Sequence, residues 1–182
     1  MLALIAKITA FPVLALLFRV RTHGYRPALK GPAIIVYNHI SRVDAIIISH
    51  VFSHKKIRFM AKKEIFRRPI NAFLSRLIGM YPADGTESSV KLLSAGKTIA
   101  ITPEGTRSAD STKPFHTGAV LISMRSGVPI YPVRIRQPFS FFSRTEISFG
   151  NPVFFETPKD QSLSHELLSD CSEKLRQYML TL

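Results

Sequence analysis

Residues 33–44 have the sequence AIIVYNHISRVD, in which a run of apolar residues leads directly into a polar turn. The apolar run at residues 33–37 is typical of a buried parallel strand. Apolar residues resume at 45–48, and the spacing of Ser41 and Asp44 before them favours a helix with Ser41 as its N-cap. The segment therefore predicts a strand, a turn and a helix, which is the repeating unit of an α/β protein with a mainly parallel sheet.

The turn places His39 and Asp44 after the carboxyl end of the strand, where open α/β sheets hold their sites. On a continuous helix, residues five apart point about 140° away from each other and could not pair. With His39 in the turn, the chain can fold back so that the carboxylate binds one ring nitrogen and leaves the other as a general base. The alternative is a helix-capping Asp beside an unrelated loop His.

The chain contains a second pair with the same spacing, His165 and Asp170. This pair lies inside a predicted amphipathic helix and has no strand before it. It lacks the context that a strand–turn–helix motif needs. We therefore interpret it as two solvated polar residues.

Composition limits the class of protein. The chain has 182 residues, 46% of them hydrophobic, which is enough for one domain with its own core. Its single cysteine, Cys171, excludes a disulfide framework and a cysteine-based metal site, and we predict no metal. The net charge of +13 at pH 7 indicates an anionic partner, such as a membrane surface, a phosphorylated substrate or nucleic acid. The lack of Trp and of an RNA-binding aromatic signature does not favour nucleic acid.

Residues 1–18 are almost wholly apolar and are followed by Arg19, Arg21 and Arg26. We interpret them as a helix that anchors the chain in a membrane or lies partly inserted in its interface, with a spanning helix and a buried core helix as alternatives. The cations that follow would keep the remainder on the cytoplasmic face, as a peripheral or monotopic protein. We therefore divide the chain into an N-terminal membrane-associating segment, residues 1–26, and one domain, residues 27–182.

Predicted strands and helices alternate through that domain. The apolar runs and turn residues predict strands at 57–61, 80–82, 98–101 and 128–135, and a hairpin from 145–149 to 153–155. They predict helices at 69–78, 87–95, 115–125 and 162–178. Prolines within residues 128–135 favour an edge position or the beginning of a strand. Cations crowd residues 55–68, which indicates either a solvated basic face or a landing surface for lipid headgroups or a polyanionic donor.

A second strand-to-loop junction carries residues suited to a site. The predicted strand at 98–101 runs into residues 102–108, TPEGTRS. Gly105 lets the backbone approach a ligand closely, and the Arg107 guanidinium matches a phosphate. Glu104 can orient Arg107 or a substrate hydroxyl. The alternative is a plain loop with a surface Arg–Glu pair.

Five segments, in order, resemble the glycerolipid acyltransferases of the lysophosphatidic acid acyltransferase type. The resemblance covers about residues 30–135 and rests on residues 38–44 (NHISRVD), 60–66 (MAKKEIF), 79–84 (GMYPAD), 103–108 (PEGTRS) and 128–133 (VPIYPV). Five ordered segments are a far more specific signal than the first alone.

The resemblance implies a glycerol-3-phosphate acyltransferase-like α/β fold, with residues 27–182 as the acyltransferase domain. It implies transfer of an acyl group from acyl-CoA or acyl carrier protein to the free hydroxyl of a lysophospholipid, above all 1-acyl-glycerol-3-phosphate, without a cofactor. It makes His39 the general base and Asp44 its orienting partner. It assigns substrate binding to Asn38, Ser41, Glu104, Gly105, Thr106 and Arg107.

We expect the two loops to meet over one sheet edge, with the His39 imidazole facing the Arg107 guanidinium. The alternatives are an acyltransferase acting on another lyso-lipid, a non-catalytic lipid-binding member of the fold, and an esterase. Two positions depart from the family. Gly85 stands where the family usually has an Arg that helps to hold the acceptor phosphate, and residues 115–118 lack a Lys that is common there.

Overall fold

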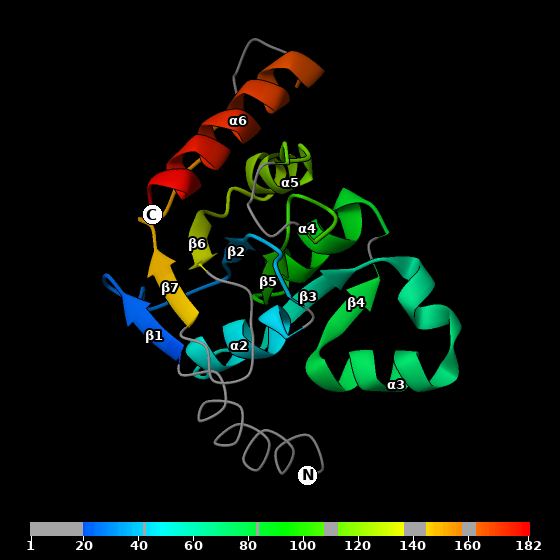
Figure 1. Ribbon diagram of the computed structural model, residues 1–182. Helices are drawn as coiled ribbons and strands as arrows, with labels where there is room; N and C mark the ends of the chain where they lie inside the picture. Colours follow the sequence, from blue (N-terminus) through cyan, green and yellow to red (C-terminus); the bar gives the residue numbers. More distant parts are fainter. Residues whose placement is uncertain (1–19, 42, 83, 108–112, 137–144, 158–162) are drawn as a thin grey trace.

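The computed structural model describes residues 20–41, 43–82, 84–107, 113–136, 145–157 and 163–182. A seven-stranded sheet forms the centre of this part of the chain (Figure 1). In spatial order the strands are β1 (Val20–His23), β7 (Thr145–Phe149), β6 (Ile130–Arg136), β2 (Ile34–Tyr37), β5 (Thr98–Ile101), β3 (Ile57–Ala61) and β4 (Met80–Pro82). Neighbouring strands are parallel except β6 and β7, which pair antiparallel. The predicted α/β class with a mainly parallel sheet is confirmed.

Strand β2 occupies the middle of the sheet because its side chains can be buried on both faces. All four of its residues are buried, and it pairs with β5 on one side and β6 on the other. Successive side chains of a strand point to opposite faces, so Ile34 and Val36 enter one core cluster while Ile35 and Tyr37 enter the other. A fully apolar strand of this kind is stable only where helices cover both faces.

Helices supply those two layers (Figure 1). Helix α2 (Asp44–Val51) packs against the face that carries Ile35 and Tyr37. The opposite face is covered by α4 (Thr86–Ser94), α5 (Gly118–Ser126) and α6 (His165–Thr181). A short 3₁₀ helix, η1 (Lys63–Arg67), and α3 (Pro69–Ile78) connect β3 to β4 at one end of the sheet.

Three details of the sheet differ from the prediction. Strand β1 lies inside residues 1–26, the range assigned to the N-terminal segment, so the sheet begins earlier than the sequence suggested. The predicted hairpin is wrong, because Val153 forms an isolated bridge with Ile130 instead of pairing with β7. Of the two positions that the prolines favoured, the edge is wrong, since β6 lies between β7 and β2, and the beginning of a strand holds for Pro129, which directly precedes β6.

The interior position of β6 is compatible with Pro132 because of where the missing N–H would point. The carbonyl of Pro132 accepts a hydrogen bond from the N–H of Gly150 at 2.9 Å, on the β7 side of the strand. The β6–β7 ladder begins only at Val133, and the bridge to Val153 lies before Pro132. Pro132 therefore lies between the bridge and the ladder, where its carbonyl takes part in the pairing although the residue has no N–H to donate.

The predicted membrane helix at residues 1–18 lies outside the described residues. Within the described ranges, no helix combines the length and the apolar character needed to cross a bilayer. The anchoring role of residues 1–18 stays a prediction.

Candidate active site

The structure brings His39 and Asp44 together at the carboxyl end of β2. Nδ1 of His39 lies 2.7 Å from Oδ2 of Asp44. The same oxygen accepts the backbone N–H groups of Ile40 and Ser41, each at 2.9 Å. Because an ionised carboxylate only accepts hydrogen bonds, Nδ1 carries the proton and Nε2 is left with its lone pair. Asp44 is fully buried while 28% of the His39 side chain is exposed, so the pair presents one basic nitrogen to incoming molecules.

The turn that holds this pair is built by Asp44 and not by Ser41. Helix α2 begins at Asp44 after Val43, so the predicted N-cap role of Ser41 is wrong. The Ser41 hydroxyl accepts only a long bond, 3.4 Å, from the N–H of Val43. The Asp44 carboxylate reaches back to three donors instead, which is stronger than one hydroxyl contact because it carries charge.

Asn38 connects β2 to β6. Its amide nitrogen donates to the carbonyl of Ile135 at 2.8 Å, and its amide oxygen accepts the N–H of Ile135 at 2.7 Å. The residue is buried. These bonds extend the pairing of the two strands past Tyr37, so the predicted substrate-binding residue Asn38 lies in the structure as a clamp beneath the His39 turn.

The loop after β5 places Glu104 next to the turn. The Glu104 side chain is buried, and among the described residues neither of its carboxylate oxygens has a hydrogen-bond partner. Burial raises the pKa of Glu104, as does the negative charge of Asp44, whereas the neighbouring His39 and the charge of Lys113 act to lower it. The two loops therefore meet over one sheet edge, as expected. The side chain that lies against the His39 turn is the Glu104 carboxylate, whereas from the sequence we expected the Arg107 guanidinium to face His39.

The other predicted residues of this loop lie further out. Gly105 adopts φ +64°, and a Cβ there would lie 3.0 Å from the His116 ring, so only glycine fits this position without displacing that side chain. The Thr106 hydroxyl accepts a hydrogen bond from Nζ of Lys113 at 2.8 Å. Arg107 is exposed.

His116 and Lys113 are two residues of this site that the sequence did not single out. The His116 ring packs on Gly105, and its main-chain N–H donates to the carbonyl of Pro103 at 2.9 Å. The only signal available beforehand was that both residues follow the 102–108 loop before a helix. That signal says nothing about contact with Gly105 or Thr106.

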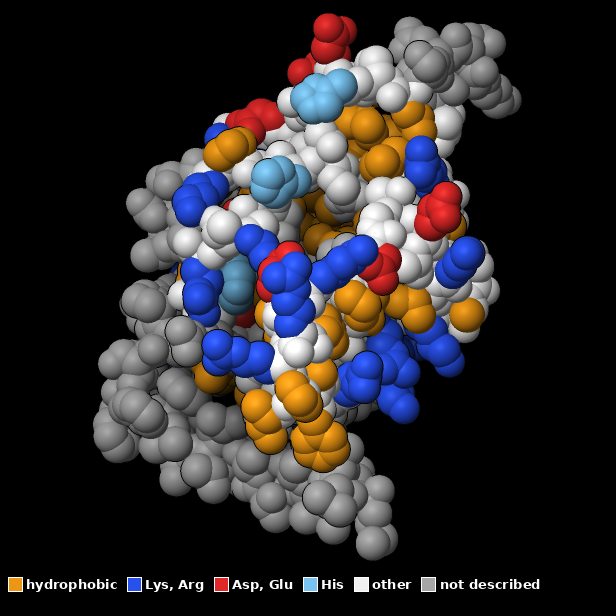
Figure 2. Space-filling model, turned by 90° about the vertical axis from the view of Figure 1, so that its right-hand side faces the viewer, with side chains coloured by type: hydrophobic (Ala, Val, Ile, Leu, Met, Phe, Trp, Pro, Cys, Tyr) orange, Lys and Arg blue, Asp and Glu red, His pale blue; other side chains and the backbone are white. Residues whose placement is uncertain are grey.

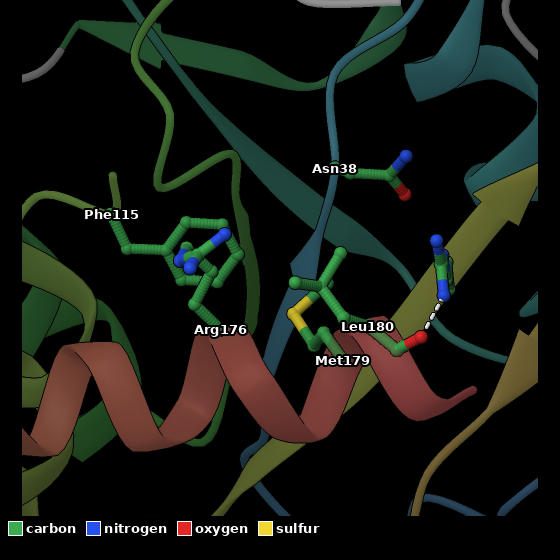
Figure 3. Close-up of a pocket in the computed structure, with 6 residues that line it drawn as sticks. Asn38, Phe115, Arg176, Met179 and Leu180 are labelled. Carbon is green, nitrogen blue, oxygen red and sulfur yellow. Dashed lines mark hydrogen bonds between the residues drawn. The ribbon is translucent and has the colours of Figure 1, made fainter. Parts of the chain in front are cut away.

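Figure 3 shows a small pocket between the end of β2 and the last turns of α6. It is lined by Asn38, Phe115, Arg134, Arg176, Met179 and Leu180. The Arg134 guanidinium donates to the Leu180 carbonyl, one of the carbonyls that a helix end leaves unpaired. Arg176 binds both carboxylate oxygens of Glu173 through two nitrogens. Arg134 thus holds the end of α6 against β6, and Arg176 is engaged in an ion pair within α6, so we assign the pocket no catalytic role.

The second pair with the same spacing consists of two solvated residues of a helix, as predicted from the sequence. His165 and Asp170 both belong to α6 and are both exposed. The helix holds them about 140° apart around its axis. In the described ranges, no three His, Cys, Asp or Glu side chains gather in a way that could hold a metal ion.

Comparisons with known proteins agree with one family. Residues 18–136 match the family model described as Acyltransferase. The chain is 32% identical over 122 residues to a 1-acyl-sn-glycerol-3-phosphate acyltransferase of Bacillus subtilis (strain 168), covering 63% of this chain and 60% of that protein. It is 29% identical over 133 residues to the enzyme of the same description from Streptococcus pneumoniae (strain ATCC BAA-255 / R6), covering 66% of this chain and 49% of that protein.

A solved structure shows the same fold. The 1-acyl-sn-glycerophosphate (LPA) acyltransferase PlsC of Thermotoga maritima superposes with a TM-score of 0.71 at 23% identity, covering 98% of this chain and 77% of that one. The chain spans only about a third to three fifths of the length of the first curated relatives it matches.

Proposed function

This chain belongs to the Acyltransferase family, and on that premise we propose that it moves a fatty acyl group from a thioester to the free hydroxyl of a lysophospholipid, above all 1-acyl-sn-glycerol 3-phosphate. The donor is acyl-CoA or acyl carrier protein. The observation that carries the proposal is the buried Asp44 carboxylate on Nδ1 of a partly exposed His39, at the carboxyl edge of a parallel sheet. Two relatives described as acting on this acceptor favour it over other lyso-lipids.

The proposed reaction is a direct attack. An alcohol is a poor nucleophile at neutral pH, so Nε2 of His39 takes its proton as the oxygen forms a bond to the thioester carbonyl carbon. Asp44 stabilises the resulting imidazolium through Nδ1. When the tetrahedral intermediate collapses, the carbon–sulfur bond breaks and the imidazolium returns its proton to the leaving thiolate. The products are an ester and a thiol, and no enzyme nucleophile is needed.

Negative charge on the carbonyl oxygen requires a donor, and the local hydrogen bonds narrow the choice. The N–H groups of Ile40 and Ser41 already bind Asp44. The N–H of Gly105 binds the carbonyl of Thr102 at 3.2 Å. These three main-chain groups are therefore occupied and would have to give up their present acceptors to bind the oxyanion.

We assign the headgroup of the acceptor to the loop that carries Glu104 and Arg107. The buried Glu104 carboxylate lies beside the His39 turn, where its charge would help to stabilise the imidazolium that forms during the attack. Exposed Arg107 and Lys113 carry the positive charge of this loop and would hold a phosphate. This chain has Gly85 where the family usually has an arginine that helps to hold the phosphate. We therefore expect the loop with Arg107 and Lys113 to provide more of the phosphate contact.

A panel of acceptors tests the proposal. Purified protein is mixed with acyl-CoA or acyl carrier protein thioester and with one of several lysolipids, and the released thiol and the acylated lipid are quantified by mass spectrometry. We expect equal amounts of thiol and diacyl lipid, largest with 1-acyl-sn-glycerol 3-phosphate. Thiol release without acylated lipid would indicate an esterase, and lipid binding without thiol release would indicate a non-catalytic carrier.

We expect Arg107→Lys to raise the KM for the phosphate-bearing acceptor about tenfold and to change kcat little. A lysine ammonium cannot reproduce the two parallel hydrogen bonds of a guanidinium on phosphate. Steady-state kinetics with varied acceptor at saturating donor measure the effect, with Arg125→Lys on α5 as the matched control. An unchanged KM would remove Arg107 from the headgroup site.

Glu104→Gln is expected to shift activity and stability in opposite directions. The substitution should lower kcat/KM about tenfold to a hundredfold by removing a negative charge beside the imidazolium that forms on His39. Burial raises the pKa of Glu104, so the folded protein binds this proton more tightly than the unfolded chain does. The wild-type carboxyl therefore loses stability as pH rises past its ordinary pKa, and the Gln variant does not.

Urea unfolding of both proteins at pH 4 and pH 7 measures the stability side of this prediction. The Gln variant should gain about 1 kcal/mol over the wild type at pH 7 and gain little at pH 4. Glu166→Gln on the exposed side of α6 serves as the control. A variant that is less stable than the wild type at pH 7 would show that the Glu104 carboxylate has a stabilising partner.

A further inference from the structure

The connection between β3 and β4 carries apolar side chains on its outer surface. Among the large hydrophobic side chains that the described residues expose, Ile65, Ile70 and Phe73 fall within nine residues, with 39%, 64% and 60% of their surface accessible. Ile70 and Phe73 are three apart on α3 and share one side of the helix. Ala72 and Ser75 are buried, so α3 rests on the protein with one side and leaves an apolar side uncovered.

Cations surround these apolar side chains. Residues 62–76 contain five cations, Lys62, Lys63, Arg67, Arg68 and Arg76, and one acid, Glu64. All six of these side chains are exposed, and Nζ of Lys63 lies 2.5 Å from Oδ1 of Asp84, so four of the five cations carry most of the positive charge. Figure 2 shows the face of the molecule that includes α3, where apolar side chains protrude at the lower end with Lys and Arg on both sides. We call this surface, formed by η1 and α3, the α3 surface.

We propose that the α3 surface docks on an anionic lipid bilayer, with Ile70 and Phe73 inserted among the acyl chains and the surrounding cations on the headgroups. An apolar side bordered by Lys and Arg is the pattern of helices that lie in a membrane interface. An anionic leaflet attracts each cation near its surface. Isolated exposed hydrophobic residues need no explanation, but a cluster of them surrounded by mainly positive charge does.

Charge favours a membrane over a second copy of the chain as the occupant. A two-fold interface would place the same patch against itself, so that cations would face cations around the apolar centre. An acidic protein would also match the cations, but an anionic bilayer supplies negative headgroups together with an apolar interior that takes up Ile70 and Phe73. The proposal goes beyond the proposed function, and it does not depend on residues 1–18.

A single fluorophore can report on this surface, because the natural chain contains no Trp. Phe73→Trp places one indole on α3, and Phe154→Trp places one at a position of similar exposure, 67% against 60%, outside the α3 surface. Each full-length variant is mixed with phosphatidylglycerol–phosphatidylcholine vesicles that do or do not carry brominated acyl chains. Co-sedimentation is measured on the same samples.

We expect the emission of Phe73→Trp to move to shorter wavelength and to be quenched by the brominated lipid, and the emission of Phe154→Trp to do neither. Arg68→Glu in the Phe73→Trp background should weaken partition into anionic vesicles about tenfold, whereas Lys174→Glu on α6 should leave it unchanged. These results would locate the bilayer at α3 even if another part of the chain also binds vesicles.

Three outcomes would overturn the proposal. The first is a lack of quenching of Phe73→Trp by brominated lipid, whether or not the protein sediments with the vesicles. The second is equal quenching of both indoles. The third is a spectral shift that depends on protein concentration without vesicles, which would indicate a second copy on this surface. The fluorescence reports lipid contact at residue 73 and not acyl transfer, so its failure would leave the proposed function standing.

Discussion

His39→Ala is expected to lower kcat/KM by about ten-thousandfold or more while leaving the unfolding transition nearly unchanged. Among the described groups of the His39 turn, the imidazole is the one that can take the proton of an attacking hydroxyl, because the Asp44 carboxylate is fully buried and its Oδ2 accepts three hydrogen bonds. Removing a partly exposed ring leaves the two backbone donors of Ile40 and Ser41 on the carboxylate. The turn should therefore persist without its base.

The matched control is His165→Ala, which removes an exposed histidine that precedes an aspartate by the same five residues. Thiol release with 1-acyl-sn-glycerol 3-phosphate as acceptor measures turnover, and circular dichroism on heating measures folding. The control should match the wild type in both. Activity of His39→Ala above a few per cent of wild type, in protein shown to be folded and free of contaminating enzyme, would remove His39 as the general base.

Asp44→Asn is expected to cost about a thousandfold to ten-thousandfold in kcat/KM and, unlike His39→Ala, to lower stability as well. An amide can present its NH₂ group to Nδ1, which would place the ring proton on Nε2 and remove the basic nitrogen. The charge that stabilises the imidazolium is lost in either orientation. The bonds from Ile40 and Ser41 also weaken when their acceptor is no longer charged.

We expect the free energy of unfolding of Asp44→Asn to fall by about 1–3 kcal/mol at pH 7, measured by urea unfolding. Asp170→Asn, at an exposed position of α6, is the control and should change neither activity nor stability by more than about 0.5 kcal/mol. If Asp44→Asn kept wild-type turnover, the carboxylate would only stabilise the turn, and its hydrogen bond to His39 would not contribute to catalysis.

Local sequence was sufficient for most of the elements. The apolar run at residues 33–37 identified β2, whose four residues are all buried. Pro69 and Gly79 marked the two ends of α3, and Gly79 adopts φ +91°, a conformation that favours glycine. A substituted Cβ there would lie 2.8 Å from the carbonyl oxygen of Ile57. Such signals succeed because they act over a few neighbouring residues.

The geometry of the turn that holds His39 was harder to predict from the sequence. The spacing of Ser41 and Asp44 matched a capping pattern, yet Asp44 binds the turn and Ser41 does not cap the helix. The two roles use residue types that are interchangeable in a sequence pattern. They differ only in which backbone N–H groups come within reach, and that depends on how the chain leaves β2.

By itself, the sequence determined the α/β class and that His39 and Asp44 could pair, because a strand, a turn and a helix in succession bring residues five apart together. Tertiary structure alone decided that β6 lies inside the sheet, that Asn38 clamps Ile135 across 97 residues, and that buried Glu104 reaches the His39 turn. These contacts follow from strand order and register. Both are set by the burial of the whole sheet, which no short segment encodes.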